Sequence, residues 1–527
     1  MKGISFLLFF VIAICTQGQL AAQSGIVVTR GAYLQKVTPY SITIRWRTNV
    51  DCNSKVEYGL DLGYGKTVFD STLTTEHTVL LTDLNPNTKY FYSVGSSDQI
   101  FQSEEVNHFT TSPLTGSTTP VHIWVTGDFG TSSVQQVAVR DAYENYSQNM
   151  ETNLWLWLGD NAYSSGLESE YQDNVFDKYP EQFKKIPVYP AIGNHDYANA
   201  GYHSTSSLTL NFPYFSIFNL PQAAEAGGIA SGTPKYYSFN YANIHFIALD
   251  SYGSFNDTGS TMYKWLESDL NMNEQRWTVA YFHHPPYTKG THNSDWEVEL
   301  IDMRKHIVPL LERYNVDVVL SGHSHCNERT SLMRGHYDFS NTFDTSMIVN
   351  RSADTLFKSS PFRGTVYAVC GTSGQNPGYT QTGFPMPCMY FSNATDNCSL
   401  VIDVEGDLFS CKYLTASSAI ADRFIIKKSG NSQEGPVTPS GENNFTVFYS
   451  NNQWMMSYYL EKRTDVKFDL LNSQGERVYD FKNIPEIQSR GFYNFQVPVN
   501  ARAIQTGVYF IRMIADDKQY TQKFVIN

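Results

Sequence analysis

The most regular feature of this chain is a series of short apolar runs, each followed by polar residues. In the central part these runs are 121–125, 154–158, 244–249, 277–282 and 316–320. Short apolar runs bounded by polar loops are typical of buried β-strands, and 132–143 and 295–314 have the apolar spacing of helices. The pattern predicts a mixed domain of the α+β or α/β class over residues 118–427, with a β-sandwich core flanked by helices.

Shorter alternating runs precede this domain. Residues 41–46 and 89–94 alternate apolar and polar side chains, as half-buried strands do. Leu84-Asn85-Pro86-Asn87-Thr88 comes just before Tyr90, the arrangement of a tyrosine corner. Residues 24–112 therefore resemble a fibronectin type III-like β-sandwich, for which we expect a role as spacer or docking surface. A stretch rich in Ser, Thr, Gly and Pro follows and is interpreted as a linker.

A second polar stretch, over 428–443, predicts another linker before a small Ig-like β-sandwich at 444–527. Strands are expected at 466–471, 507–511 and 521–526. This order of strands and glycines resembles the C-terminal sorting domain of Bacteroidetes type IX secretion cargo, which implies contact with that machinery. An ordinary Ig-like accessory domain is the alternative.

The N-terminus has the pattern of an export signal. Lys2 supplies a positive charge, residues 4–15 are almost continuously apolar, and the small residues Ala21 and Ala22 offer a cleavage site. Residues 1–23 are therefore predicted to be a signal peptide. The apolar run is too short for a membrane anchor, and no later stretch is long enough. We expect a secreted or cell-surface protein after Sec-type export.

Composition narrows the class of protein. With 41% hydrophobic and 17% charged residues, the chain has ample apolar surface for folded cores. The formal charge of −13 argues against a nucleic-acid scaffold, and no basic tract reverses it. An acidic protein still binds an anionic substrate when bound metal ions dominate the local field.

Six cysteines remain once the signal, with Cys15, is removed. They are Cys52, Cys326, Cys370, Cys388, Cys398 and Cys411. An even number in an exported chain permits up to three disulfides, and Cys388–Cys398 is the local bridge that we favour. The alternative is that several of them are free and buried.

Polar motifs follow most of the apolar runs in the central domain. They are Gly127-Asp128-Phe129-Gly130, Gly159-Asp160-Asn161-Ala162-Tyr163, Gly193-Asn194-His195-Asp196, His283-His284-Pro285 and Gly322-His323-Ser324-His325. Taken singly, several of them are ordinary turn sequences. Together they contain the carboxylate, amide, phenol and imidazole groups that hold two metal ions while leaving room for water and substrate. The set predicts metal-assisted hydrolysis of a phosphate ester.

Two assignments depend on local chemistry. His283 and His284 compete for one position, because strand alternation sends adjacent side chains to opposite faces. A tyrosine ligand such as Tyr163 favours a strongly Lewis-acidic ion such as ferric iron, whose charge would lower the high pKa of the phenol. The alternative for Tyr163 is packing under the loop.

The ordered set of motifs resembles the calcineurin-like metallophosphoesterases. The spacing Gly159-Asp160-x-x-Tyr163 and the preceding β-sandwich are similar to the purple acid phosphatases. The resemblance implies a Fe(III) site formed by Asp128, Asp160, Tyr163 and His325. It implies a second site for divalent iron, zinc or manganese formed by Asp160, Asn194, His283 and His323. It also makes His195 and His292 the catalytic histidines outside the metal shell.

The resemblance implies an exported acid phosphatase that hydrolyses phosphomonoesters by attack of a metal-bound hydroxide. A phosphodiesterase or nucleotide-cleaving enzyme with the same metals is the alternative within the enzymes. A different class of protein, a surface binding module with an inactive metal site, is disfavoured because the ligand set is complete.

Overall fold

A computed structural model describes most of the chain. The described residues are 25–429, apart from 351, 353 and 360, and 445–526, apart from 451–452, 461–463, 482–486, 489–490, 498–506 and 516–517. The expected signal peptide, Cys15 and most of the second expected linker lie outside these residues. Among the described residues, none of the helices combines the length and apolarity needed to span a bilayer.

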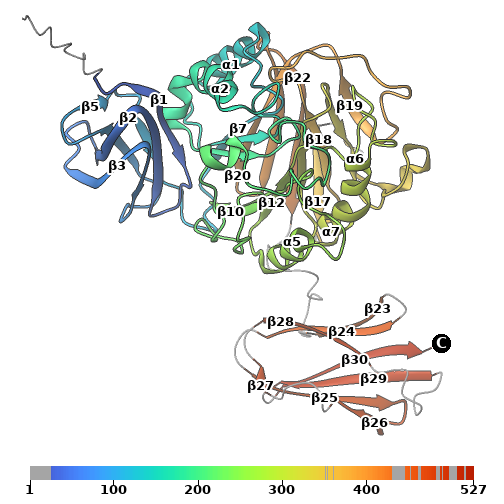
Figure 1. The fold of residues 1–527 in the computed structure, drawn as a ribbon. Helices are drawn as coiled ribbons and strands as arrows, with labels where there is room; N and C mark the ends of the chain where they lie inside the picture. Colours follow the sequence, from blue (N-terminus) through green and yellow to red (C-terminus); the bar gives the residue numbers. More distant parts are fainter. Residues whose placement is uncertain are drawn as a thin grey trace, which may run out of the picture.

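The N-terminal strands form one connected sheet, as Figure 1 shows in blue. Its strands are β1 (Val28–Gln35), β2 (Ile42–Gly59), β3 (Lys66–Leu81), β4 (Lys89–Gly95), β5 (Ile100–Gln102) and β6 (His108–Thr110). The long strand β2 pairs with β1 through its first half and with β4 through its second half. The expected tyrosine corner is present, because the backbone N–H of Asn85 donates to Oη of Tyr90 over 3.0 Å.

Two larger sheets make up the central domain among the described residues. One has the order β17-β22-β21-β20-β7-β8-β9 and the other β10-β11-β12-β13-β18-β14-β19. The first comprises β7 (Val121–Thr126), β8 (Leu154–Leu158), β9 (Val188–Ala191), β17 (Thr355–Ser359), β20 (Cys398–Glu405), β21 (Leu408–Thr415) and β22 (Ile420–Ser429). The second comprises β10 (Tyr237–Tyr241), β11 (Ile244–Ala248), β12 (Trp277–Tyr281), β13 (Val318–Ser321), β14 (Asn327–Thr330), β18 (Val366–Cys370) and β19 (Met389–Asn393). A small β15 (Leu332–Met333) and β16 (Ile348–Asn350) pair lies apart.

The two sheets pack face to face through aromatic and aliphatic side chains. The ring of Trp277 in one sheet lies 5.5 Å from that of Phe409 in the other, and Tyr189 stacks on Phe239 at 3.9 Å. Strands β7, β8 and β9 run parallel in the first sheet, and β11, β12, β13 and β18 run parallel in the second. Every apolar run predicted for the central domain overlaps one of these strands, within one or two residues at the ends, which confirms the β-sandwich core.

Helices cover the outer faces of the central sheets. They are α1 (Val134–Ser147), α2 (Glu168–Glu170), α3 (Pro180–Lys185), α4 (Pro213–Ile217), α5 (Thr261–Met272), α6 (Val298–Asp302) and α7 (Val308–Arg313), with a π-helical turn η1 at Tyr171–Val175. The helix expected at 295–314 begins later and is divided by a π-helical turn at Met303–Ile307. Pro309 explains part of this, because it has no N–H to donate to the preceding turn.

One hydrophobic core crosses from the N-terminal sheet into the central domain. One continuous cluster joins the N-terminal sheet to the two central sheets. A second lies between strands β11, β12, β13 and β18 and the helical segments α5, Met303–Ile307 and α7. The N-terminal sheet is therefore packed onto the central domain rather than only tethered to it.

At the C-terminal end of the central domain, β22 continues to Ser429, two residues into the linker predicted at 428–443.

The favoured disulfide is wrong. All six described cysteines are free and buried. Cys388 packs with the cluster that underlies helices α5 to α7, whereas Cys398 begins β20 in the opposite sheet. Two residues close in sequence are thus held in different layers, and the alternative of free buried thiols is the one observed.

The C-terminal strands have a core of their own. They are β23 (Phe445–Ser450), β24 (Gln453–Leu460), β25 (Thr464–Asn472), β26 (Arg477–Asp480), β27 (Ile487–Gln488), β28 (Gly491–Gln496), β29 (Gly507–Ala515) and β30 (Lys518–Ile526). The three strands predicted here fall within β25, β29 and β30. Their core contains residues such as Phe468, Leu470 and Ile511.

Candidate metal centre

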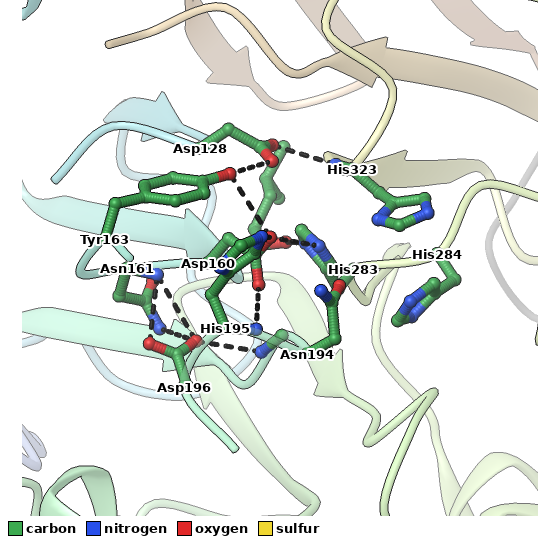
Figure 2. A network of polar contacts seen from close by, with 12 residues as sticks. Asp128, Asp160, Asn161, Tyr163, Asn194, His195, Asp196, His283, His284 and His323 are labelled. Carbon is green, nitrogen blue, oxygen red and sulfur yellow. Dashed lines mark hydrogen bonds and ion pairs between the residues drawn. The ribbon is translucent and has the colours of Figure 1, made fainter. Parts of the chain in front are cut away.

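The predicted ligands come together where parallel strands of both sheets end (Figure 2). Asp128, Asp160 and Asn194 follow β7, β8 and β9 of one sheet. His283 and the pair His323 and His325 follow β12 and β13 of the other. The carboxyl ends of both sheets therefore meet around one centre, as in other layered α/β folds.

Asp128 and Asp160 form the buried base of the centre and share the phenol of Tyr163. Oη of Tyr163 donates to Oδ1 of Asp128 over 2.8 Å and lies 3.2 Å from Oδ2 of Asp160. Burial and then the two carboxylates raise the pKa of Tyr163 well above its ordinary value. Deprotonation of this phenol thus requires a cation that takes the place of its proton between the oxygens.

His283 and His325 approach the same carboxylates from the second sheet. Nε2 of His283 lies 3.0 Å from Oδ2 of Asp160, and Nε2 of His325 lies 3.6 Å from Oδ1 of Asp128. Burial alone would lower the pKa of His283, but the charges of Asp160 and Asp128 raise it to about 9. Burial alone would raise the pKa of Asp160, and the charge of His283 instead takes it below its usual range. This mutual stabilisation shows how strongly the centre attracts positive charge.

The competition between His283 and His284 is resolved by their orientation. The two rings are perpendicular, at 88°. His284 turns away from Asp160, stacks on Tyr252 at 5.4 Å and holds its Nδ1 2.9 Å from Oγ of Ser251. Alternation at the strand end thus leaves His283 facing the carboxylates.

Asn194 and His195 enter from the loop after β9. Oδ1 of Asn194 is buried without a hydrogen-bond partner. The backbone N–H of His195 donates to Oδ1 of Asp160 over 2.8 Å, and its ring Nε2 lies 3.8 Å from Oδ2 of the same residue. Nδ1 of His195 lies 2.6 Å from the Ser164 carbonyl oxygen, which accepts a hydrogen bond from it. The other ring nitrogen, Nε2, faces the centre.

His292 and His323 lie side by side, and Glu297 contacts both of their rings. Their rings are 3.8 Å apart, and Oε2 of Glu297 lies 2.7 Å from Nδ1 of His292 and 3.4 Å from Nε2 of His323. Glu297 was not anticipated as part of the site, because it lies in a stretch predicted only as a helix, directly before α6, and no motif marks it. It is the carboxylate that orients the predicted substrate-side histidine.

Asp196 supports the centre from behind. Its carboxylate accepts from the backbone N–H groups of Gly193 and Asn161, over 2.9 and 3.0 Å, and from Oη of Tyr171 over 2.6 Å. Burial and the nearby charge of Asp160 raise its pKa to about 7. Asp196 belongs to a predicted motif, but its role in holding two ligand loops together emerges only from the tertiary contacts.

The side-chain donor atoms at this centre are better suited to bind metal ions than to bind one another. Nε2 of His283, like Oδ1 of Asn194, is buried with no hydrogen bond of ordinary geometry, which is costly unless a ligand satisfies it. Ligand atoms of Asp128, Asp160 and His283 all lie within 4.8 Å of one another. A Cβ at Gly159, where φ is +90°, would lie 2.7 Å from Nδ1 of His283, so only glycine allows this approach. Oxygen and imidazole donors of this kind suit iron, zinc and manganese.

Comparison with known families agrees with this geometry. Residues 121–327 match the calcineurin-like phosphoesterase family, and 31–111 match the purple acid phosphatase N-terminal domain. Residues 450–527 match the secretion system C-terminal sorting domain, which supports secretion or display at the cell surface. The family is metal-dependent, with a dinuclear centre, in keeping with the cluster of possible metal ligands described above.

Individual relatives point the same way. The chain is 30% identical to purple acid phosphatase 23 of Arabidopsis thaliana over 281 residues, 48% of this chain and 57% of the relative. It is 28% identical to purple acid phosphatase 1 of Ipomoea batatas over 318 residues, 57% and 62% of the two chains. The match thus spans about half to two thirds of these relatives' length.

Solved structures share the fold. A purple acid phosphatase from yellow lupin (Lupinus luteus) seeds superposes with a TM-score of 0.60 at 17% identity, covering 78% of each chain. A structure of PhoD gives 0.56 at 14% identity, covering 76% of this chain and 90% of the other. The described part of the chain therefore shares the fold of these structures, and along the sequence it matches first the purple acid phosphatase N-terminal domain, then the calcineurin-like phosphoesterase family and then the sorting domain.

Proposed function

We propose that this protein is an exported acid phosphatase that hydrolyses phosphomonoesters at a dinuclear, iron-containing centre. The observation that carries the proposal is the convergence of two buried carboxylates with the imidazole of His283, 3.0 Å from Asp160, and with Oδ1 of Asn194, which is buried without a hydrogen-bond partner. Such a donor set is expensive to bury unless cations hold it together. Small phosphate esters are the proposed substrates, and the type IX secretion machinery is the proposed partner of the C-terminal domain.

The proposed ligands divide into two groups around Asp160. Asp128, Asp160, Tyr163 and His325 would hold Fe(III), while Asp160, Asn194, His283 and His323 would hold a divalent iron, zinc or manganese ion. A phenolate ligand at Tyr163 would favour ferric iron at the first position, because a strongly Lewis-acidic ion lowers the high pKa of the phenol. Asp160 is proposed to bridge the two sites, since its carboxylate lies close to Tyr163 on one side and His283 on the other.

When bound, the two ions would supply positive charge to the phosphate oxygens and lower the pKa of a water molecule. Nδ1–H of His195 donates a hydrogen bond to the Ser164 carbonyl, so that Nε2 is available to contact a substrate oxygen. His292 directs Nδ1 to Glu297 in the same way, which leaves its Nε2 to give a proton to the leaving oxygen. Both histidines are thus held in defined tautomers by acceptors on the far side of the ring.

The test compares wild type with Asp160→Asn on a phosphomonoester and a phosphodiester that share one aryl leaving group. We expect wild type to bind two metal ions and to prefer the monoester, whereas Asp160→Asn loses metal and at least about 10³-fold in kcat/KM. Asp141→Asn, at an exposed ion pair with Arg140, is the control and should match wild type. A preference for the diester would favour the phosphodiesterase alternative, and no turnover of either ester by the metal-loaded wild type would contradict the proposal.

A further inference from the structure

The N-terminal sheet reaches the central domain through two arginines that share one carboxylate. Nη2 of Arg30 lies 2.6 Å from Oε1 of Glu168, and Nη1 of Arg47 contacts the same oxygen. Nε of Arg30 also donates to Oε1 of Gln172 over 3.0 Å, and its guanidinium lies 4.2 Å from the ring of Phe176. The Arg30 side chain is almost completely buried, so this contact is fixed in geometry.

Helix α2, which begins with Glu168, also holds the turn that follows Tyr163. The carboxylate of Glu170 accepts from three backbone N–H groups: Ser164 over 2.6 Å, Ser165 over 2.9 Å and Leu167 over 2.9 Å. A carboxylate that accepts several backbone N–H bonds fixes the backbone as well as its own position. The arginine contact and the turn are therefore two ends of one short rigid piece.

This turn contacts the metal centre directly. The Ser164 carbonyl accepts from Nδ1 of His195, and Nδ2 of Asn199 lies 3.1 Å from the same oxygen. The Tyr163 carbonyl accepts from Nδ2 of Asn174 over 2.9 Å, and the Tyr163 ring lies 4.5 Å from that of His195. A shift of the turn would move a proposed metal ligand and a proposed catalytic histidine together.

We infer that the N-terminal domain is a positioning element of the metal centre. Arg30 and Arg47, acting through Glu168, fix the turn that carries Tyr163 and orients His195. The inference deepens the proposed function, since it assigns a role to a domain that would otherwise be a spacer. None of the residues in this contact needs to touch substrate, so they act by position and not by chemistry.

The matched control is a second ion pair across the same interface. Nζ of Lys36 lies 2.9 Å from Oε1 of Glu225, with the two acidic side chains similarly exposed, at 42% for Glu168 and 34% for Glu225. The pair of Lys36 and Glu225 contributes little to global stability, whereas Glu168→Ala also leaves the buried Arg30 guanidinium without this carboxylate. Other contacts remain in either variant, including the bond from Oη of Tyr33 to the Ile217 carbonyl. A local effect confined to Glu168 therefore separates positioning from general interface weakening.

The experiment measures amide hydrogen exchange of residues 162–167, kcat and KM in the full-length, metal-loaded protein. In Glu168→Ala we expect exchange in this segment to rise about tenfold or more. We also expect kcat to fall about tenfold, with KM changed by less than about twofold. Arg47→Met should give the same result from the other side of the interface, which guards against a folding defect in one variant. Glu225→Ala should change none of these quantities.

Equal exchange and kinetics in the Glu168 and Glu225 variants would overturn the inference. So would a loss of exchange protection spread over the whole central domain. If no form of the protein hydrolyses a phosphomonoester, yet exchange at 162–167 rises only in Glu168→Ala and Arg47→Met, the positioning role stands and the proposed phosphatase function fails.

Discussion

Three of the proposed ligands have backbone conformations that residues other than glycine rarely adopt. The φ angles are 55° for Asp128, 49° for Asp160 and 64° for His323. Such left-handed residues cluster at functional sites, where the surrounding structure holds them. The residue types and their order after apolar runs were readable in the sequence, whereas these dihedral angles, which turn the side chains over the strand ends, were not. Glu297 was missed for another reason, since no motif marks it and its contacts with His292 and His323 arise only in the folded chain.

At the scale of single residues, the proposed role of Tyr163 predicts a spectroscopic signature. We predict that the iron-loaded protein has a visible tyrosinate-to-iron charge-transfer band and that Tyr163→Phe loses it. Tyr214→Phe removes another buried hydroxyl, which donates to the Pro190 carbonyl, and should leave the band unchanged. Absorption spectra with metal analysis of the same samples make the test. A band that persists in Tyr163→Phe with two metals bound would exclude this tyrosine as the ligand.

At the scale of elements, a buried charge cluster joins the two central sheets. Asp317 lies just before β13, and its carboxylate is 2.6 Å from Nζ of Lys358 in β17 and 2.7 Å from Nζ of Lys428 in β22. These strands belong to opposite sheets. The apolar run at 316–320 predicted a strand here, but the sequence could not show that two distant lysines would meet a carboxylate inside the sandwich.

This cluster predicts a large and specific loss of stability. Asp317→Asn leaves two buried ammonium groups without a counter-charge and should lower the free energy of unfolding by about 3–5 kcal/mol. Glu267→Gln, at the exposed ion pair with Arg313, is the control and should cost less than about 1 kcal/mol. Urea unfolding of both variants measures the difference. Equal effects would mean that the buried cluster does not join the sheets.

The difference in stability between wild type and Asp317→Asn should also depend on pH. Burial alone would raise the pKa of Asp317, but Lys358 and Lys428 hold it below the ordinary value. A lowered carboxyl pKa contributes stability that is fully present above the unfolded-state pKa of about 3.9 and is lost as the pH falls through the folded-state pKa. The stability difference between wild type and Asp317→Asn should therefore shrink only on strong acidification. A difference that is constant down to the acid transition would contradict this origin.

At the scale of the whole molecule, the two predicted linkers divide the chain into three domains, whereas the hydrophobic cores separate only the C-terminal strands from the rest. The N-terminal sheet shares one hydrophobic cluster with the central sheets, whereas the C-terminal strands have a separate one. A chain that ends after Ser429 should therefore keep its thermal transition and its kcat/KM, and lose correct export or surface display. Calorimetry, kinetics and cell fractionation check these outcomes. A loss of activity in the truncated chain would show that the C-terminal domain contributes to the centre.

The sequence by itself determined the apolar runs of the central strands, the ordered set of candidate metal-binding motifs and the resemblance to the calcineurin-like phosphoesterases, because apolar runs and side-chain chemistry are local properties. It also marked the C-terminal sorting domain through its spacing of strands and glycines. Only the tertiary structure decided which of His283 and His284 faces the carboxylates, that Cys388 and Cys398 lie in different layers, and that Glu168 links the N-terminal sheet to the Tyr163 turn. These outcomes depend on how distant strands and loops pack, and no local pattern in the chain encodes that packing.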